Sequence, residues 1–461
     1  MRSLIVIAAV AIGIFAGVFL MAAMNSSVVQ RLDAAVNEEL SHIQVNNKDF
    51  RSSADIQNII SDYPRVVAAL ESTPGVTKVT GRMIIRGIAS TATKSSGVEI
   101  TGVNVEKEKE MFTLSGKLIP GTGSYFETDT KFNTAFIGEK LAKELNIIRY
   151  IITPEAITSL REKGIPSNVV SKVETLQGQR YTSDKKFVKA YEKILAPGEI
   201  KKYGWKIKEA AWSYREGSKI ILSFLDITNN QTGAAFRVSG IFRTNNDMFE
   251  SLSLFVPIDE LRQLTGMKEG TFHRVIARLE DNDITDDATP VIREKLADYE
   301  VLNWKEIQPD LAMIADFMGQ IYAIFMIIIL AALAFGIVNT MLMAVLERTR
   351  ELGMLMAIGM NRRKIFMMIM LESIFLSIVG GFAGMAVSEI VIAITGKTGI
   401  NLMKYSEGME AMGYSAHLFP TIDAQFFVTT TILIVLTGII SAIYPARKAL
   451  KLNPVEAIRG E

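Results

Sequence analysis

The sequence predicts an α-helical membrane protein with four transmembrane helices and one large α+β extracytoplasmic domain between the first and second helices. Three observations lead to this fold class. The mean hydropathy of the 461-residue chain is +0.24, which is high for a soluble protein. The charged fraction of 21% is nevertheless too high for a chain made only of membrane helices. The apolar residues are concentrated in four long runs, which reconciles the two values.

Each of these runs is long enough to cross a membrane. A helix rises about 1.5 Å per residue, so about 20 residues span a hydrocarbon core of about 30 Å. We therefore assign transmembrane helices to residues 1–24, 319–346, 365–396 and 425–446. The alternative for the first run is a cleaved signal peptide, whose apolar core has about 7–15 residues. The uncharged stretch Leu4–Met24 is longer than such a core.

The distribution of Lys and Arg predicts the orientation of the helices. The 347–364 loop carries five of these residues and the 447–461 tail carries four, whereas the 397–424 loop has two. Short loops rich in Lys and Arg stay in the cytoplasm. Both termini and the 347–364 loop are therefore expected to be cytoplasmic, and residues 25–318 to be extracytoplasmic.

The extracytoplasmic region has the pattern of a mixed α+β domain. Strand-like runs with alternating or β-branched residues occupy 78–88, 219–224 and 235–242. Helix starts are expected at Ser53 and at Thr153, where Pro154 would lie in the first turn. The stretch 150–214 is rich in Lys and Glu at helical spacing and is interpreted as a helical insertion. It is either a functional lid or docking arm, or a surface segment without a special role.

No pattern of an active site is present, so the sequence predicts a protein that is not an enzyme and has no catalytic, cofactor-binding or metal-binding residues. There are no cysteines and only three histidines, which are far apart. Gly396-Lys397-Thr398 lacks the earlier glycine of a phosphate-binding loop. The net charge of +1 gives no sign of a nucleic-acid partner. Glu372 and Glu389 are interpreted as carboxylates at the membrane boundary rather than as a proton relay.

Small residues in the membrane runs predict close helix packing. Two GxxxG motifs let helix backbones approach each other in lipid. We predict helix-packing roles for Gly13, Gly17, Gly336, Gly380 and Gly384. Dimerisation is expected through the first two spans, near Gly13, Gly17 and Gly336.

The 347–364 loop is the clearest functional signal. It begins with charged residues, continues with an apolar stripe and ends with a basic helix start. This pattern predicts a short amphipathic helix that offers Met354, Leu355 and Ile358 to a soluble partner. The alternative is an ordinary positively charged cytoplasmic loop.

Several segments resemble the MacB/FtsX-like permeases, the transmembrane subunits of type VII, or mechanotransmission, ABC transporters. ERTRELGMLMAIGMNRRKIF (347–366) resembles the region of the family that contacts the ATPase, and YPARKALKLNPVEAIRG (444–460) resembles its C-terminal signature. IGEKLAKELN (137–146) and AFRVSGIFRTNN (235–246) are similar to its periplasmic domain.

The resemblance implies site residues and partners. A separate cytoplasmic ATPase, present in two copies, would bind ATP and Mg. The coupling residues would be Glu347, Arg348, Glu351, Leu352, Gly353, Met354, Ala357 and Gly359. The matched C-terminal residues are Pro445, Ala446, Pro454 and Glu456.

Within the family the layout looks closest to the lipoprotein-releasing LolC/LolE subunits, in a bacterial inner membrane. The substrate would then be a lipoprotein or another amphiphile. It would reach the second span from lipid at Phe325 and Ile328, with Ile434 as an outward-facing comparison position. A MacB-like efflux subunit for peptides or drugs and an FtsX-like transmitter to a cell-wall hydrolase are the alternatives. A second permease copy or homologue, and a periplasmic carrier or adaptor, are the other implied partners. The 150–214 insertion matches none of these layouts.

Overall fold

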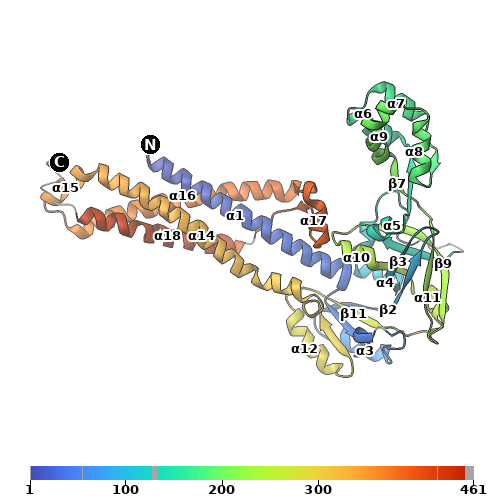
Figure 1. Ribbon diagram of the computed structural model, residues 1–461. Helices are drawn as coiled ribbons and strands as arrows, with labels where there is room; N and C mark the ends of the chain where they lie inside the picture. Colours follow the sequence, from blue (N-terminus) through green and yellow to red (C-terminus); the bar gives the residue numbers. More distant parts are fainter. Residues whose placement is uncertain (1, 54, 127–131, 423, 452–461) are drawn as a thin grey trace. The chain divides into compact units, whose positions relative to one another are not determined.

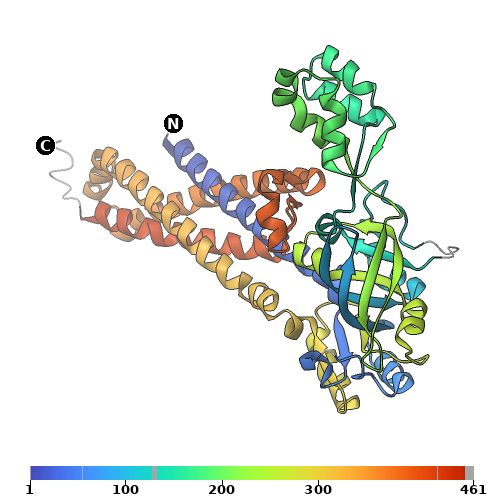
Figure 2. The same cartoon turned by 45° about the vertical axis from the view of Figure 1, so that its right-hand side comes forward.

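The computed structural model describes residues 2–53, 55–126, 132–422 and 424–451 (Figures 1 and 2). They divide into two compact units, which are described separately. The helical unit contains the residues up to Leu32, Pro309–Met409 and the residues from Tyr414 onward. The sheet unit contains Asp33–Gln308 together with Glu410–Gly413.

Four helices of the helical unit are long and apolar enough to cross a membrane, which confirms the predicted spans. They are α1 (Arg2–Ala34), α14 (Pro309–Glu347), α16 (Arg362–Thr398) and α18 (Ala424–Leu450). Two of them extend beyond the apolar runs. α14 begins at Pro309 rather than at 319, and α1 continues past Met24 into the π-helix η1 (Ala35–Leu40). Hydropathy marks the part that suits lipid, whereas backbone hydrogen bonding continues through polar residues.

The four helices share one hydrophobic core. The buried residues of α1 recur every three or four positions, as expected for one helix face: Val6, Val10, Ile14, Val18 and Met21. The connection from α14 to α16 is the short α15 (Thr349–Ala357). The connection from α16 to α18 contains β13 (Ile400–Asn401), η3 (Met403–Tyr405), α17 (Ser406–Ala411) and β14 (His417–Leu418).

The sheet unit is built on a nine-stranded sheet with the order β12-β1-β11-β2-β3-β10-β4-β9-β8. The strands are β1 (Ile43–Asn46), β2 (Val76–Ser90), β3 (Ser95–Val103), β4 (Thr134–Gly138), β8 (Lys219–Leu225), β9 (Gln231–Phe242), β10 (Ser253–Pro257), β11 (Arg274–Leu279) and β12 (Glu300–Asn303). β2, β8 and β9 confirm the three strands that the sequence predicts.

An additional pairing between β2 and β8 closes six of these strands into a barrel. Gly87 of β2 lies at the closure, opposite Val98 of β3 and Phe224 of β8. A Cβ atom on Gly87 would lie 2.7 Å from the carbonyl oxygen of Ser223, so this approach requires glycine.

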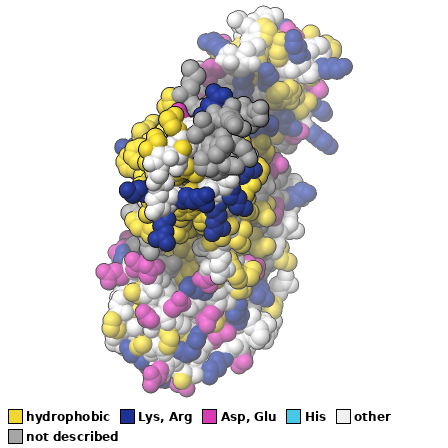
Figure 3. All heavy atoms as spheres, turned by 90° about the vertical axis from the view of Figure 1, so that its left-hand side faces the viewer, with side chains coloured by type: hydrophobic (Ala, Val, Ile, Leu, Met, Phe, Trp, Pro, Cys, Tyr) yellow, Lys and Arg dark blue, Asp and Glu magenta, His cyan; other side chains and the backbone are white. Residues whose placement is uncertain are grey.

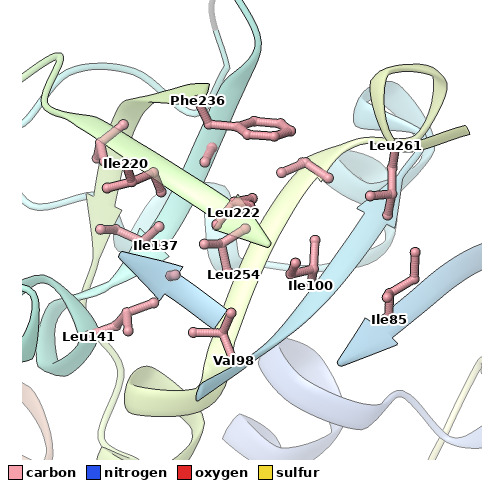
Figure 4. Close-up of a cluster of buried hydrophobic side chains, with 14 of the residues drawn as sticks. Ile85, Val98, Ile100, Ile137, Leu141, Ile220, Leu222, Phe236, Leu254 and Leu261 are labelled. Atoms are coloured by element: carbon pink, nitrogen blue, oxygen red, sulfur yellow. The ribbon is translucent and has the colours of Figure 1, made fainter. Parts of the chain in front are cut away.

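The barrel interior is the main core of the sheet unit (Figure 4). Side chains from all six barrel strands meet there with Leu141 of α5 (Glu139–Glu144) and Leu261 of α11 (Ile258–Thr265). The central strand residues are Ile85, Val98, Ile100, Ile137, Leu222 and Leu254. Each fully buried Leu or Ile stabilises the fold by about 1.5–3 kcal/mol.

The remaining helices of the sheet unit cover its other surfaces. α3 (Tyr63–Glu71) and α12 (Thr285–Lys295) pack on β1, β11 and β12 and complete a second core. The shorter elements are α2 (Phe50–Ser53), α4 (Val105–Met111), η2 (Leu114–Lys117), α10 (Asp247–Leu252) and α13 (Trp304–Ile307).

The expected helix start at Ser53 is wrong. Ser53 is the last residue of α2, and α3 begins later, where the side chain of Asp62 accepts a hydrogen bond from the backbone N–H of Arg65. Between them the Asp55 carboxylate accepts the backbone N–H of Gln57 at 2.9 Å. Such an Asx turn competes with a helical start.

Residues 148–214 form a module with its own core, which we call the arm. Its elements are β5 (Ile148–Ile151), α6 (Pro154–Glu162), α7 (Ser167–Glu174), β6 (Arg180–Tyr181), α8 (Asp184–Glu192), α9 (Pro197–Ala211) and β7 (Trp212–Tyr214). Thr153 caps α6 with Pro154 in the first turn, as predicted. The small sheet β6-β5-β7 was not predicted, because strands of two to four residues show no readable alternation.

Candidate functional site

The loop between α14 and α16 folds as the short helix that the sequence predicts, followed by a tight turn. After α15, Gly359 has a φ of +95°, its N–H donates to the Met356 carbonyl at 3.1 Å, and the Met360 N–H donates to the Leu355 carbonyl at 3.0 Å. This is a Schellman ending, in which glycine avoids the strain of positive φ. Asn361 then caps α16 by accepting the Arg363 N–H at 2.9 Å. The loop therefore holds α15 in a defined position.

α15 has a buried face and an exposed face. Leu352 and Gly353 are buried, and Leu355 packs against the core of the helical unit. These three residues therefore face the bundle, which corrects the expectation that Leu355 is offered to a partner and places two of the expected coupling residues, Leu352 and Gly353, on the inner face. The exposed coupling residues are Glu347, Arg348, Glu351, Met354, Ala357 and Gly359, with Ile358 and Met360 beside them.

Lys and Arg side chains surround the exposed apolar residues of α15. Figure 3 looks onto the end of the helical unit that carries α15, where Lys and Arg side chains lie among hydrophobic ones. The exposed basic residues near α15 and at the adjoining helix ends are Arg348, Arg350, Arg362, Arg363, Lys364, Arg447, Lys448 and Lys451. We call Met354, Ile358 and Met360 with these basic residues the coupling surface. Its chemistry suits a partner with an apolar pocket and acidic residues at the rim.

Glu372 on α16 stabilises the N-terminal end of α15 by an ion pair. Nη1 of Arg348 lies 3.2 Å from Oε1 of Glu372, and both side chains are partly exposed. An exposed ion pair contributes at most about 1 kcal/mol, so its main effect is to orient Arg348.

The predicted packing glycines lie in different surroundings. Gly13 and Gly17 lie against Leu333 and Ile329 of α14 in the same chain. Gly380 and Gly384 of α16 lie against α1. Gly336 has no atom within 4 Å of the position where a Cβ would be built. The space beside Gly13 is thus occupied by this chain's own α14, so a dimer contact there would have to displace Leu333.

The C-terminal motif is described only in part. Pro445 and Ala446 are buried inside α18, where Ala446 belongs to the core shared with Leu352 and Ile365. Pro454 and Glu456 lie outside the described residues.

The two tentative substrate positions lie on the exposed surface of α14. Phe325 is 38% exposed and Ile328 is 59% exposed. Ile434 of α18, chosen as an outward-facing comparison, is 4% exposed and packs against Gly381, so that expectation is wrong. Glu389 lines a cavity of about 700 Å³ between α16 and α18, whose other walls are mainly apolar.

The polar contacts that the C-terminal part of α1 makes with α14 and with Phe419 were not predicted from the sequence. The Ser26 hydroxyl donates to the Phe419 carbonyl at 2.6 Å, and the Tyr322 hydroxyl donates to the Asn25 side chain at 3.0 Å. Asn25 and Tyr322 also line a cavity of about 480 Å³ between α1, α14 and α18. The Asn25-Ser26-Ser27 sequence after the first span was the available signal.

Two of the three histidines are structural. The backbone N–H of Ile84 donates to Nδ1 of buried His273 at 3.0 Å. Burial lowers the pKa of His42 to about 4, so this histidine is neutral at physiological pH. Among the described residues, no group of three or more His, Asp or Glu side chains could hold a metal ion.

Comparison with known proteins identifies relatives among the ABC transporter permeases. The family model described as FtsX-like permease C-terminal matches residues 323–454. The uncharacterized ABC transporter permease MJ1507 of Methanocaldococcus jannaschii is 30% identical over 237 residues, which cover 49% of this chain and 55% of that protein. The macrolide export ATP-binding/permease protein MacB of Escherichia coli is 28% identical over 234 residues, which cover 49% of this chain and 34% of that protein.

A solved structure, the extracellular domain of the noncanonic ABC-type transporter YknZ, aligns with a TM-score of 0.28 and 13% identity over 57% of this chain and 98% of that chain. The chain spans about half, or less, of the length of the two curated relatives above. Residues 323–454 match the FtsX-like permease model, and the resemblance of this chain to the MacB/FtsX-like permeases is confirmed.

Proposed function

We propose that this chain is the transmembrane subunit of a type VII ABC transporter, driven by a separate cytoplasmic ATPase that docks on the coupling surface. The observation that carries the proposal is the position of α15 within the FtsX-like permease domain, with Met354 and Ile358 exposed. Ile358 is 78% exposed beside a core that buries Leu352. A partner that covers Ile358 removes this apolar surface from water.

The ATPase would supply the complementary surface. Its docking pocket would receive Met354 and Ile358, while acidic residues at its rim would pair with the arginines around α15. Glu351, the exposed acidic residue of α15, would pair with a basic group of the ATPase. ATP and Mg would be bound by that subunit, in two copies.

The expected arrangement in the membrane follows from the charge distribution. The coupling surface and both termini would lie in the cytoplasm and the sheet unit on the other side, as in a bacterial inner membrane. Two permease chains, identical or homologous, would assemble with the two ATPases. ATP binding would draw the coupling surfaces together, and the rigid helices would transmit this movement to the sheet units.

The proposed cargo is a lipoprotein or another amphiphile taken from the membrane. The exposed apolar surface of α14, which includes Phe325 and Ile328, supports this choice because acyl chains can lie against it. A layout like that of LolC/LolE, with a periplasmic carrier as acceptor, would fit such a cargo.

MacB-like efflux is the second candidate function. The names of two relatives favour it, because one is described as a macrolide exporter and another, PvdT of Pseudomonas putida, as a pyoverdine exporter. A periplasmic adaptor would then be a partner. An FtsX-like transmitter that activates a cell-wall hydrolase is the remaining alternative.

Copurification tests the proposed function. The full chain would be expressed with the ABC ATPase encoded nearest to it, and complex formation and ATP hydrolysis would be measured for the parent, Ile358→Glu and Met412→Glu. Met412 is a matched control, because it is 75% exposed on the connection between α16 and α18. We expect the ATPase to copurify with the parent and with Met412→Glu but not with Ile358→Glu. Equal copurification of both variants would contradict docking at α15. Mass spectrometry of bound molecules would separate a lipoprotein cargo from a small exported compound.

A further inference from the structure

A cavity of about 550 Å³ lies on the surface of the sheet unit, outside the barrel. Its floor is formed by β11, β2 and β3, and α10 and η1 stand at its edges. The charged residues that line it are Glu39, Arg82, Arg86, Glu99 and Arg274. Alternation explains this face, because Met83, Ile85, Val98 and Ile100 of the same strands point into the barrel core.

The strand register places two arginines directly opposite each other. Arg82 of β2 is the partner of Arg274 of β11, and Arg86 of β2 is the partner of Glu99 of β3. Like charges in directly opposite positions destabilise a sheet. The Arg86–Glu99 pair is balanced, so the unfavourable pairing is that of Arg82 with Arg274.

Arg82 is fully partnered within the chain. Its guanidinium forms a buried ion pair with Glu108, donates to the Glu39 carbonyl at 3.3 Å and lies 4.3 Å from the centre of the Phe112 ring. Its charge is therefore compensated by a carboxylate outside the cavity. Glu108 is 1% exposed and serves this pair.

Arg274 is only partly partnered. Its Nε donates to the Asn46 side chain at 3.0 Å. Among the described residues its two terminal nitrogens have no hydrogen-bond partner and no carboxylate oxygen within 4 Å, although the side chain is only partly exposed. Of the acidic residues that line the cavity, Glu39 accepts Asn246 Nδ2 at 3.0 and 3.1 Å, and Glu99, whose charge acts on Arg274, is the strand partner of Arg86. Among the described residues, no carboxylate therefore forms an ion pair with Arg274, although Glu99 and Glu300 act on its charge from beyond 4 Å.

The other walls of the cavity are apolar. Phe255 of β10 and Phe249 of α10 line it, and Met248 and Leu252 of α10 stand at its rim. Met248 is 69% exposed and Leu252 is 48% exposed, so this helix presents apolar surface to solvent next to the arginines. A ligand that fits both features carries one anionic group and one apolar chain.

We propose that this cavity is a binding site for an anionic amphiphile, whose phosphate or carboxylate lies against Arg274 and Arg86 and whose hydrocarbon lies along Phe249, Phe255 and Leu252. The bound anion balances the charge of Arg274 and completes the hydrogen bonding of its terminal nitrogens. The site is independent of ATPase docking, and it rests on the proposed function only in that such a ligand would be the cargo or a part of it.

Binding of short, water-soluble probes to the full chain in phosphatidylcholine nanodiscs tests the site. The probes are octyl phosphate, octanoate, inorganic phosphate and octyltrimethylammonium, with Kd from calorimetry and the location from hydrogen–deuterium exchange. We expect octyl phosphate or octanoate to bind and to protect β2, β3 and α10. Comparison of these two identifies the anionic group. Inorganic phosphate, which lacks the apolar chain, is expected to bind at least about tenfold more weakly, and the cation not to bind.

Variants identify the arginines that carry the binding. Arg274→Gln is expected to weaken binding by about tenfold or more, the usual effect of losing a hydrogen bond to a charged group. Arg86→Gln, on the exposed side of the cavity, provides the same test if Arg274→Gln fails to fold. Arg215→Gln, an exposed arginine outside the cavity, is the control. Unchanged binding in the folded cavity variants, protection elsewhere, or equal affinity for inorganic phosphate would overturn the proposal. The ATP hydrolysis that the permease stimulates in its ATPase, measured without any probe, should be the same in all variants. A negative result for this cavity would therefore leave the proposed function intact.

Discussion

Gly384 of α16 and Ala11 of α1 are in backbone contact. A Cβ atom on Gly384 would lie 2.5 Å from the carbonyl oxygen of Ala11 and 3.0 Å from its Cα. Gly380, one turn earlier, has the same relation to Val10 and to the carbonyl of Ile7. The GxxxG motif of the third span therefore serves packing inside one chain, because only glycine lets two helix axes come this close.

This contact predicts a strong position dependence for glycine substitutions. Gly384→Leu should destabilise the helical unit by at least about 1–3 kcal/mol, the usual cost of overpacking, because the side chain meets the Ala11 backbone. Gly336→Leu is the matched control, since nothing lies within 4 Å of its Cβ position. Thermal unfolding in detergent would measure both. Equal Tm values for the two variants would show that α1 and α16 do not pack at Gly384.

The second prediction concerns the contact between two permease copies. Leu333 occupies the space beside Gly13, whereas α14 carries an unpartnered apolar stripe at seven- and four-residue spacing, formed by Phe317, Ile324, Ile328 and Phe335. Such spacing is typical of a helix-packing face. We expect the second copy to dock on this stripe.

Single cysteines test the stripe directly, because the chain has no cysteine of its own. Phe335→Cys, at a position 69% exposed, should form a disulfide between two copies in the membrane, whereas Gly13→Cys should not. Dimers through Gly13→Cys but not Phe335→Cys would support the contact first expected from the sequence and exclude the stripe.

The third prediction is a pH effect on the sheet unit. The pKa of Glu250 is raised to about 7, mainly by burial and also by the nearby Glu139 and Asp247. The Thr244 N–H, which donates to its Oε1 at 2.5 Å, acts in the opposite direction. The folded state then binds a proton more tightly than the unfolded state, whose pKa is near 4.5. The stabilising contribution of the protonated form is complete below pH 4.5 and is lost as the pH rises through 7.

Glu250→Gln removes this titration. The Tm of the variant minus that of the parent should therefore be higher at pH 8 than at pH 5. The corresponding change in the free energy of unfolding between the two pH values is at most about 3 kcal/mol. Glu106→Gln, at an exposed position, is the control for replacing a glutamate by glutamine. Glu260, whose pKa burial also raises to about 7, leaves some pH dependence in every variant. If Tm plotted against pH is parallel for Glu250→Gln and the parent, ionisation of Glu250 does not destabilise the folded state, and the prediction is wrong.

The sequence predicts the helices of this protein better than their faces. Four apolar runs were enough to place the spans, because crossing lipid requires length and apolar composition only. In α18, however, Ile432 is 56% exposed and Ile434 is 4% exposed, and both are isoleucine. Lipid and protein interior have similar polarity, so no pattern of polar residues distinguished the two positions, and Ile434 was placed wrongly.

The sheet unit shows a second limit. β2 was predicted from its own alternation, but its pairing with β8 joins Ser90 to Ile221, 131 positions later in the chain. No local pattern reports such a pairing. For the same reason, the opposition of Arg82 and Arg274 is visible only in the register of the folded sheet. At the coupling surface the sequence predicted α15 correctly but not that Leu352 and Gly353 face inward.

The most direct test of the central claim is a cysteine crosslink between α15 and the ATPase. Ile358→Cys and Met412→Cys would be placed separately in the full chain, and each complex with the ATPase would be treated with a short thiol–amine crosslinker. The account predicts a permease–ATPase product for Ile358→Cys that depends on the ATPase, and none for Met412→Cys. Crosslinking from Met412→Cys, or none from Ile358→Cys in a complex that still copurifies, would contradict docking of the ATPase on α15.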